Sequence, residues 1–86
     1  MAQIKKLVLD VLKPHKPTIL ELASALTEPS SGYTVNIKVV EIDDKTETLE
    51  ITVLGANVSL ETISEKISEL GGSVHSIDEV EVSAVP

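Results

Sequence analysis

Six short segments, each with its own regular spacing of apolar residues, constrain the fold of this 86-residue chain more than any other feature. Four of them alternate apolar with polar residues or are dense in β-branched residues, which is typical of strands. The other two repeat apolar residues at helical spacing. We predict strands over residues 4–12, 33–42, 46–54 and 74–82, and helices over residues 17–27 and 60–70. The element order is therefore βαββαβ.

Turn-forming residues separate these segments. The residue before Pro29 resists helical angles, so the first helix must end there. Asp43-Asp44-Lys45 predicts a short hairpin turn, since aspartate side chains bond the local backbone. Ser59 is a plausible N-cap, and Gly71-Gly72 predicts a helix stop.

The last predicted strand contains one irregularity. Its apolar residues Ile77, Val80 and Val82 share a face only if a β-bulge lies near residues 78–79. We therefore predict a bulge at that point.

This order predicts an α+β fold of the ferredoxin-like type. It is a βαββαβ sandwich with an antiparallel sheet of strand order 4-1-3-2 and two helices on one face. We expect a single domain over residues 1–86, with its core at about residues 4–82 and a C-terminal tail at 83–86. The topology brings the loop around His15, the hairpin and residues 70–79 to one end of the sheet. It leaves the other sheet face without helices, so that solvent or another subunit must cover it.

Composition narrows the classes of function. Tyr33 is the one aromatic residue, so the core must be aliphatic, and a chain this short is marginally stable unless it associates. The net charge of −7 and the lack of arginine argue against nucleic-acid binding. No apolar run is long enough to span a membrane. The absence of cysteine and of a signal-peptide pattern leads us to expect a cytoplasmic protein.

Charge is distributed unevenly along the chain. Residues 1–38 contain five lysines and three acidic residues, whereas residues 39–86 contain two lysines and eleven acidic residues. This asymmetry favours head-to-tail contacts between copies, which close into rings. We expect a homo-oligomer larger than a dimer.

The first candidate site contains both histidines. Its members are Asp10, His15, His75 and Asp78. If His75 lies opposite Lys13, then Asp78 lies opposite Asp10, at roughly 5 Å. Two carboxylates this close repel each other unless a cation or proton lies between them, so a divalent cation (Ca²⁺, Mg²⁺ or Zn²⁺) is one interpretation. The alternative is that Asp10 pairs with Lys13 or Lys6 while the bulge directs Asp78 into solvent.

The second candidate site is the acidic hairpin. Its members are Glu41, Asp43, Asp44 and Glu47. Oxygen-only ligands suit Ca²⁺ or Mg²⁺, although the spacing is not that of an EF-hand and an acidic turn is commonly just solvated. The turn lies roughly 10 Å, or two strands, from the last strand, so Asp44 and His75 can share an ion only between subunits. We expect Lys13 and Lys16 to be exposed loop charges.

Three stretches carry a family resemblance: VLDVLKPH at residues 8–15, EIDDKTET at 41–48 and GGSVHSIDEV at 71–80. They resemble a small archaeal family catalogued as domain of unknown function 211, from about Ile4 to Val82. The resemblance implies a ferredoxin-like fold and a homo-oligomeric, ring-like assembly. It implies no activity.

These features together predict a homo-oligomeric binding module for a divalent metal ion or small ligand, near the His15/His75 end or between subunits. An alternative is a structural or partner-binding scaffold without a ligand. A third is an enzyme that uses His75 and Asp78, although neighbouring strand residues point to opposite faces and no nucleophile motif is present. We expect no partner among nucleic acids or membranes.

Overall fold

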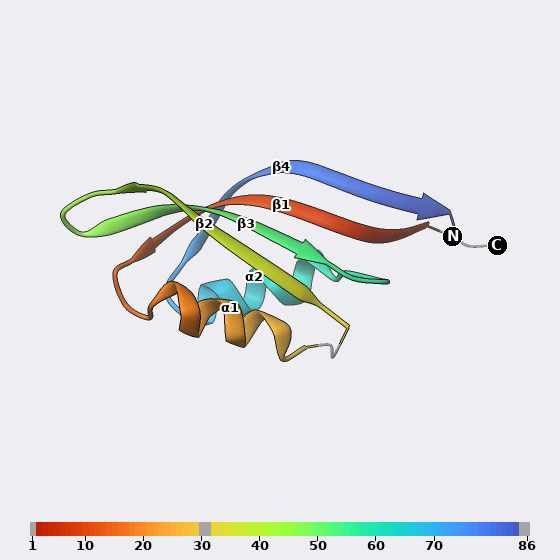
Figure 1. The fold of residues 1–86 in the computed structure, drawn as a ribbon, viewed down its shortest axis with the longest axis horizontal. Coiled ribbons are helices and arrows are strands. Elements are labelled where there is room, and N and C mark those ends of the chain that lie inside the picture. Colours follow the sequence, from red (N-terminus) through yellow and green to blue (C-terminus); the bar gives the residue numbers. More distant parts are fainter. Residues whose placement is uncertain (1, 30–31, 85–86) are drawn as a thin grey trace.

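The computed structural model, which describes residues 2–29 and 32–84, has two layers: a four-stranded sheet and two helices that cover one of its faces (Figure 1). The elements are β1 (Ala2–Pro14), α1 (Ile19–Thr27), β2 (Thr34–Ile42), β3 (Thr46–Leu54), α2 (Leu60–Glu69) and β4 (Ser73–Ala84). The strand order is β2-β3-β1-β4, and every pair is antiparallel. The predicted ferredoxin-like βαββαβ sandwich is therefore confirmed. Within the described residues, neither helix has the length and hydrophobicity to cross a membrane.

β1 and β4 are longer than the sequence pattern predicts. Ala2 pairs with Ala84 and Gln3 with Ser83, so the first two residues of the predicted tail continue β4. The polar and small residues there have little strand propensity, and the partner strand supplies the backbone bonds that extend the ladder. The other two residues of the predicted tail, at 85–86, lie outside the described residues.

α1 begins at Ile19 rather than at Pro17, because Thr18 caps it. The Thr18 hydroxyl accepts a hydrogen bond from the Glu21 N–H (3.2 Å), and the Glu21 carboxylate accepts one from the Thr18 N–H (2.8 Å). This reciprocal capping box satisfies two of the orphan donors at the helix start. The Thr-x-x-Glu spacing was visible in the sequence. At α2, the predicted Ser59 N-cap is confirmed, since its hydroxyl accepts from the Thr62 N–H.

The core between the layers is aliphatic. β1 and β3 alternate, so that Leu7, Leu9 and Val11 face the helices beside their cross-strand partners. The fully buried cluster comprises Leu7, Leu9, Val11, Leu22, Leu26, Leu49, Ile51, Val53, Val58, Ile63 and Ile67.

Three register shifts interrupt the pairing of β4 with β1: one skips Lys5 on β1, and the other two are bulges on β4. The register passes from Leu9↔Ile77 to the next pair by skipping Asp78, which confirms the predicted bulge. A second, unpredicted bulge skips His75, between the pairs made by Val74 and Ser76.

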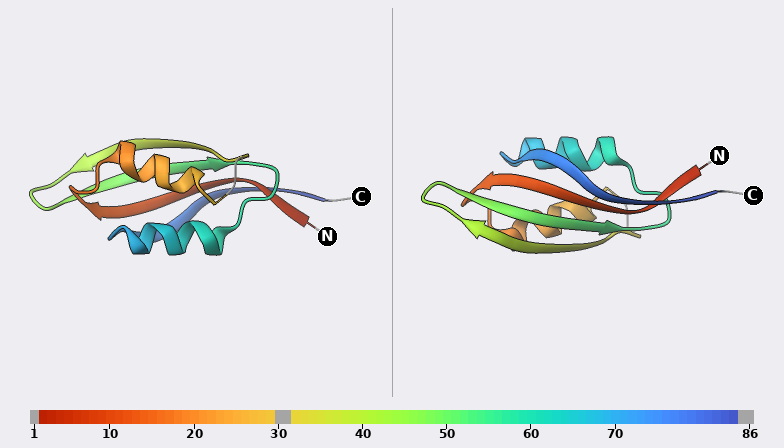
Figure 2. Two further views of the ribbon diagram at one scale, coloured as in Figure 1. Left: turned by 90° about the horizontal axis from the view of Figure 1, so that it is seen from below. Right: turned by 90° about the horizontal axis from the view of Figure 1, so that it is seen from above.

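The β4 bulges direct three apolar side chains toward the helix side of the sheet, yet they stay half-exposed. Ile77, Val80 and Val82 pair with Leu9, Leu7 and Ile4, but are 50%, 52% and 51% exposed. The C-terminal part of β4 runs past the end of α2 along the open edge of the sheet (Figure 2). We call these three residues the β4 apolar stripe.

The three predicted junctions do meet at one end of the sheet. A Cβ placed on Gly71 would lie 3.7 Å from the Pro14 ring, so the α2–β4 turn packs against the end of β1. The His15 ring contacts the β2–β3 hairpin through Asp44 and Glu47. Gly71 has a φ of 89°, the left-handed conformation expected of a helix C-cap glycine.

Candidate functional site

Lys13 is buried at this end of the sheet, and among the described residues it is the charged side chain most completely removed from solvent. Its ammonium lies 2.8 Å from the Pro14 carbonyl, 2.6 Å from that of Pro17 and 3.3 Å from that of His15. It also pairs with Glu47 Oε1 at 3.0 Å. The expectation that Lys13 is an exposed loop charge is therefore wrong.

The burial of Lys13 follows from strand alternation. β1 continues through Pro14, so Lys13 points to the same side as Leu9 and Val11, toward the helices. The loop that follows then wraps over the ammonium and presents its carbonyl oxygens. Lys16, the other lysine in question, is exposed as expected.

His15 and Glu47 connect that loop to the hairpin. Glu47 Oε2 lies 3.0 Å from His15 Nδ1, and the Asp44 carbonyl oxygen lies 2.9 Å from His15 Nε2. Both partners are acceptors, so both contacts are hydrogen bonds only when the ring is doubly protonated. The Glu47 carboxylate, and then the Asp44 carbonyl, raise the pKa of His15 above its ordinary value. His15, and then Lys13, lower the pKa of Glu47.

The four hairpin acids do not converge on one point. Glu41 pairs with Thr48 on the face without helices, whereas Glu47 points to the helix side beside Lys13. Asp43 and Asp44 are exposed at the turn, which the Asp43 N–H closes by donating to the Thr46 carbonyl. Since Lys13 and His15 engage both oxygens of Glu47, we assign no metal-ligand role to the hairpin set.

Asp10 and His75 form a second arrangement, on the sheet face without helices. Asp10 Oδ2 lies 3.3 Å from His75 Nδ1, and the two side chains are 31% and 79% exposed. Together with Leu12 and Thr48 they line a hollow of about 270 Å³, which we call the Asp10–His75 hollow. The bulge at His75 places its ring on this face, above β1.

The predicted pairing of Asp10 with Asp78 is wrong. Asp10 lies opposite Ser76 on β4 and opposite Glu50 on β3. Asp78 occupies its bulge and accepts a hydrogen bond from the Ser76 hydroxyl at 2.7 Å. The short α2–β4 turn places Ser73 opposite Leu12, which shifts β4 from the register assumed in the prediction. The carboxylate opposed to Asp10 is therefore that of Glu50 and not that of Asp78.

The lysine partners expected for Asp10 are also engaged elsewhere. Lys6 pairs with Glu79 at 2.8 Å, and this hydrogen bond raises the pKa of Lys6. Lys13 points to the other face of the sheet. Among residues 2–29 and 32–84, no three His, Asp or Glu side chains are grouped so that they could hold a metal ion by themselves. His15, His75 and Asp78 thus have separate partners, although the topology brings them to one region.

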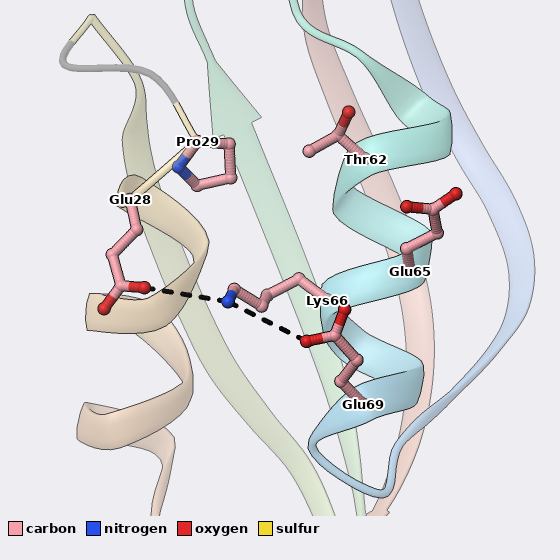
Figure 3. A pocket seen from close by; sticks show the side chains of 6 residues that line it. All are labelled: Glu28, Pro29, Thr62, Glu65, Lys66 and Glu69. Atoms are coloured by element: carbon pink, nitrogen blue, oxygen red, sulfur yellow. Dashed lines mark ion pairs between the residues drawn. The ribbon is translucent and has the colours of Figure 1, made fainter.

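A second hollow, of about 300 Å³, lies between the helices and was not anticipated (Figure 3). Lys66 reaches from α2 toward Glu28 at 3.7 Å and Glu69 at 3.9 Å. These ion pairs are solvent-exposed and long, so each contributes at most about 1 kcal/mol. The only signal in the sequence was the i,i+3 spacing of Lys66 and Glu69.

Among the residues whose position differs from the sequence prediction, Lys13 is the most informative. The signal that identifies it is the continuation of the Leu9, Val11 alternation by one further step. A strand that ends at Leu12 conceals that step, whereas a strand that ends at Pro14 places Lys13 in the core layer.

Comparison with known proteins adds a family but no activity. A family model described as uncharacterized ArCR, DUF211, matches residues 5–84. The uncharacterized protein MJ0319 of Methanocaldococcus jannaschii is 49% identical over 80 residues, which cover 93% of this chain and 82% of the relative. Neither description states a ligand, a reaction or a partner.

Proposed function

Since this chain belongs to the DUF211 family of uncharacterized ArCR proteins, from which no activity can be transferred, we propose on geometric grounds that it is a homo-oligomeric binding module for a divalent cation. The cation binds in the Asp10–His75 hollow, and a second copy or water completes its coordination. The observation that carries this proposal is the close approach of one carboxylate and one imidazole on an uncovered sheet face.

The spacing of the two donors supports a shared ion. A tetrahedral Zn²⁺ with bonds of about 2.0–2.1 Å separates two of its ligands by about 3.3 Å. Asp10 Oδ2 and His75 Nδ1 are 3.3 Å apart, so a cation can bind between them with little movement of either side chain. A mixed nitrogen and oxygen donor set favours Zn²⁺ over Ca²⁺ or Mg²⁺. The net charge of −7 attracts cations to the surface.

Metal-dependent melting tests the site. Excess Zn²⁺ is expected to raise the melting temperature of the wild type relative to chelator, because an ion that binds only the folded state stabilises it by about 2.7 kcal/mol at 100 times its Kd. Asp10→Asn and His75→Gln should each remove most of that increase. Melts with Ca²⁺ and Mg²⁺ should show smaller shifts.

Asp78→Asn is the matched control for this experiment. It makes the same chemical change as Asp10→Asn. Asp78 was one of the four predicted metal ligands, but its carboxylate accepts a hydrogen bond from Ser76 and does not line the Asp10–His75 hollow. It should retain the full response to Zn²⁺. A wild type that responds to no metal, or an equal loss in Asp78→Asn, would contradict the site and favour the ligand-free scaffold alternative.

Self-association is the second part of the proposal. The β4 apolar stripe and the sheet face without helices are surfaces that a second copy can cover, and the uneven charge distribution favours head-to-tail contact. Light scattering at moderate salt is expected to give a mass above that of a dimer. Val80→Lys, which places a charge on an edge strand, should lower that mass. A monomer mass that is independent of concentration would refute this part.

A further inference from the structure

We propose that Lys13, Glu47 and His15 form a proton-dependent latch, which fastens the β2–β3 hairpin to the β1–α1 loop when the His15 ring carries both of its protons. The latch lies on the helix side of the sheet and is separate from the Asp10–His75 hollow. Its members come from β1, β3 and the loop between β1 and α1.

The fixed part of the latch is Lys13. Its side chain is 1% exposed, and its ammonium is surrounded by three loop carbonyls and by Glu47 Oε1. An ammonium has three N–H donors, and in Lys13 all three are directed at these carbonyl oxygens and at the Glu47 carboxylate. Glu47, 16% exposed, is thereby held with its second oxygen directed at His15.

The switching part is the His15 ring, which is 41% exposed and therefore open to proton exchange with solvent. Protonated, it donates from Nδ1 to Glu47 and from Nε2 to the Asp44 carbonyl. Neutral imidazole has a single N–H, so the other nitrogen presents a lone pair to an oxygen about 3 Å away. One of the two contacts must then open, and the loop that carries His15 is released from either Glu47 on β3 or Asp44 in the hairpin turn.

The acceptors around the ring favour its protonation, whereas the lysines of this region are cations that oppose it. Glu47 faces the ring from β3, and the Asp43 and Asp44 backbone carbonyls face it from the hairpin. The Lys13 ammonium, from β1, contacts the other oxygen of Glu47. Next to it in the loop is Lys16. From α1, Glu21 interacts with both lysines.

The pKa shifts of His15 and Glu47 determine how the stability of the latch depends on pH. The raised pKa of His15 means that its stabilisation is complete below pH 6.5 and is lost as pH rises through the higher pKa of the folded state. The lowered pKa of Glu47 means that its stabilisation is present above pH 4.5 and is lost as pH falls through the lower folded value. The latch is therefore strongest in mildly acidic solution and opens on the alkaline side.

The latch is positioned to regulate the Asp10–His75 hollow, an extension that rests on the proposed function. Lys13 pairs with Glu47 across β1 and β3, and the adjacent pair is Leu12 with Thr48. Successive pairs point to opposite faces, so the pair beside the latch forms a wall of the hollow. Opening of the latch frees this end of the strand pair and loosens that wall.

The experiment is an NMR titration of the full chain, with chelator and no added metal, from about pH 5 to about pH 9, the range in which histidine titrates. The His15 ring should titrate above pH 6.5, and the amides of Asp44 and Lys45 should shift with the same midpoint. The Thr48 methyl should follow that midpoint if the latch acts on the hollow. In His15→Gln these shifts should be absent, and in His75→Gln they should persist.

Glu47→Gln keeps the size of the side chain but removes its charge, and it should move the His15 midpoint down. The latch would be overturned if the hairpin amide shifts did not follow the His15 midpoint, or if they persisted in His15→Gln. Hairpin amides that follow His15 while Thr48 does not would support the latch and overturn its extension to the hollow. Because metal is absent throughout, these outcomes do not depend on whether the hollow binds a cation.

Discussion

Lys13→Met is expected to lower the free energy of unfolding by about 3–5 kcal/mol, which is a large fraction of the stability of a small domain. Lys13 is 2% exposed and neutralises a mostly buried carboxylate while donating to loop carbonyls. Methionine fills similar volume without supplying a donor. Glu47 then remains as a poorly solvated charge with one oxygen unpaired, and the carbonyls of Pro14 and Pro17 lose their partner.

Urea unfolding measures this loss, and Lys16→Met is the matched control. Lys16 lies in the same loop but is exposed to solvent. Its replacement should therefore change the free energy of unfolding by no more than about 0.5 kcal/mol. Equal stabilities of Lys13→Met and Lys16→Met would show that the ammonium of Lys13 does not support the fold.

Leu9→Ala is expected to cost about 2–5 kcal/mol, because Leu9 is 0% exposed at the centre of the aliphatic core. Its cross-strand partner Ile77 points to the same side but is 50% exposed. Ile77→Ala should therefore cost only about 1 kcal/mol in an isolated chain. Because the two residues are neighbours on one sheet face, the difference between the two variants measures the effect of burial on stability.

Chemical denaturation at several protein concentrations checks both values. If copies associate through the β4 apolar stripe, the cost of Ile77→Ala should grow with concentration while that of Leu9→Ala stays large throughout. Losses of similar size at every concentration would mean that Ile77 is as important to the folded chain as a core residue, which contradicts its exposure.

The sequence by itself determined the fold, the strand order and, to within one residue, the bounds of β2, β3 and α2. Alternation and helical spacing are local patterns, and the handedness of crossovers leaves few topologies for a βαββαβ order. The bulge near Asp78 was also local information, because Ile77, Val80 and Val82 cannot share a face without it. The family resemblance, confirmed over residues 5–84, rests on the same segments.

Only the tertiary structure decided which side chains meet. The pairing of β4 with β1 depends on the length of the α2–β4 turn and on a second bulge at His75, and neither leaves a periodic signal. The register consequently placed Ser76 and Glu50 beside Asp10, where Asp78 was expected.

Burial of Lys13 was likewise decided by the assembled chain. A lysine after a strand is ordinarily solvated, and it is held inside here because residues distant in sequence supply a carboxylate and the loop closes over the ammonium. The same contacts engaged His15 with the hairpin and left His75 to pair with Asp10. Contacts of this kind depend on ångström-scale geometry between separate strands, which local residue patterns do not encode.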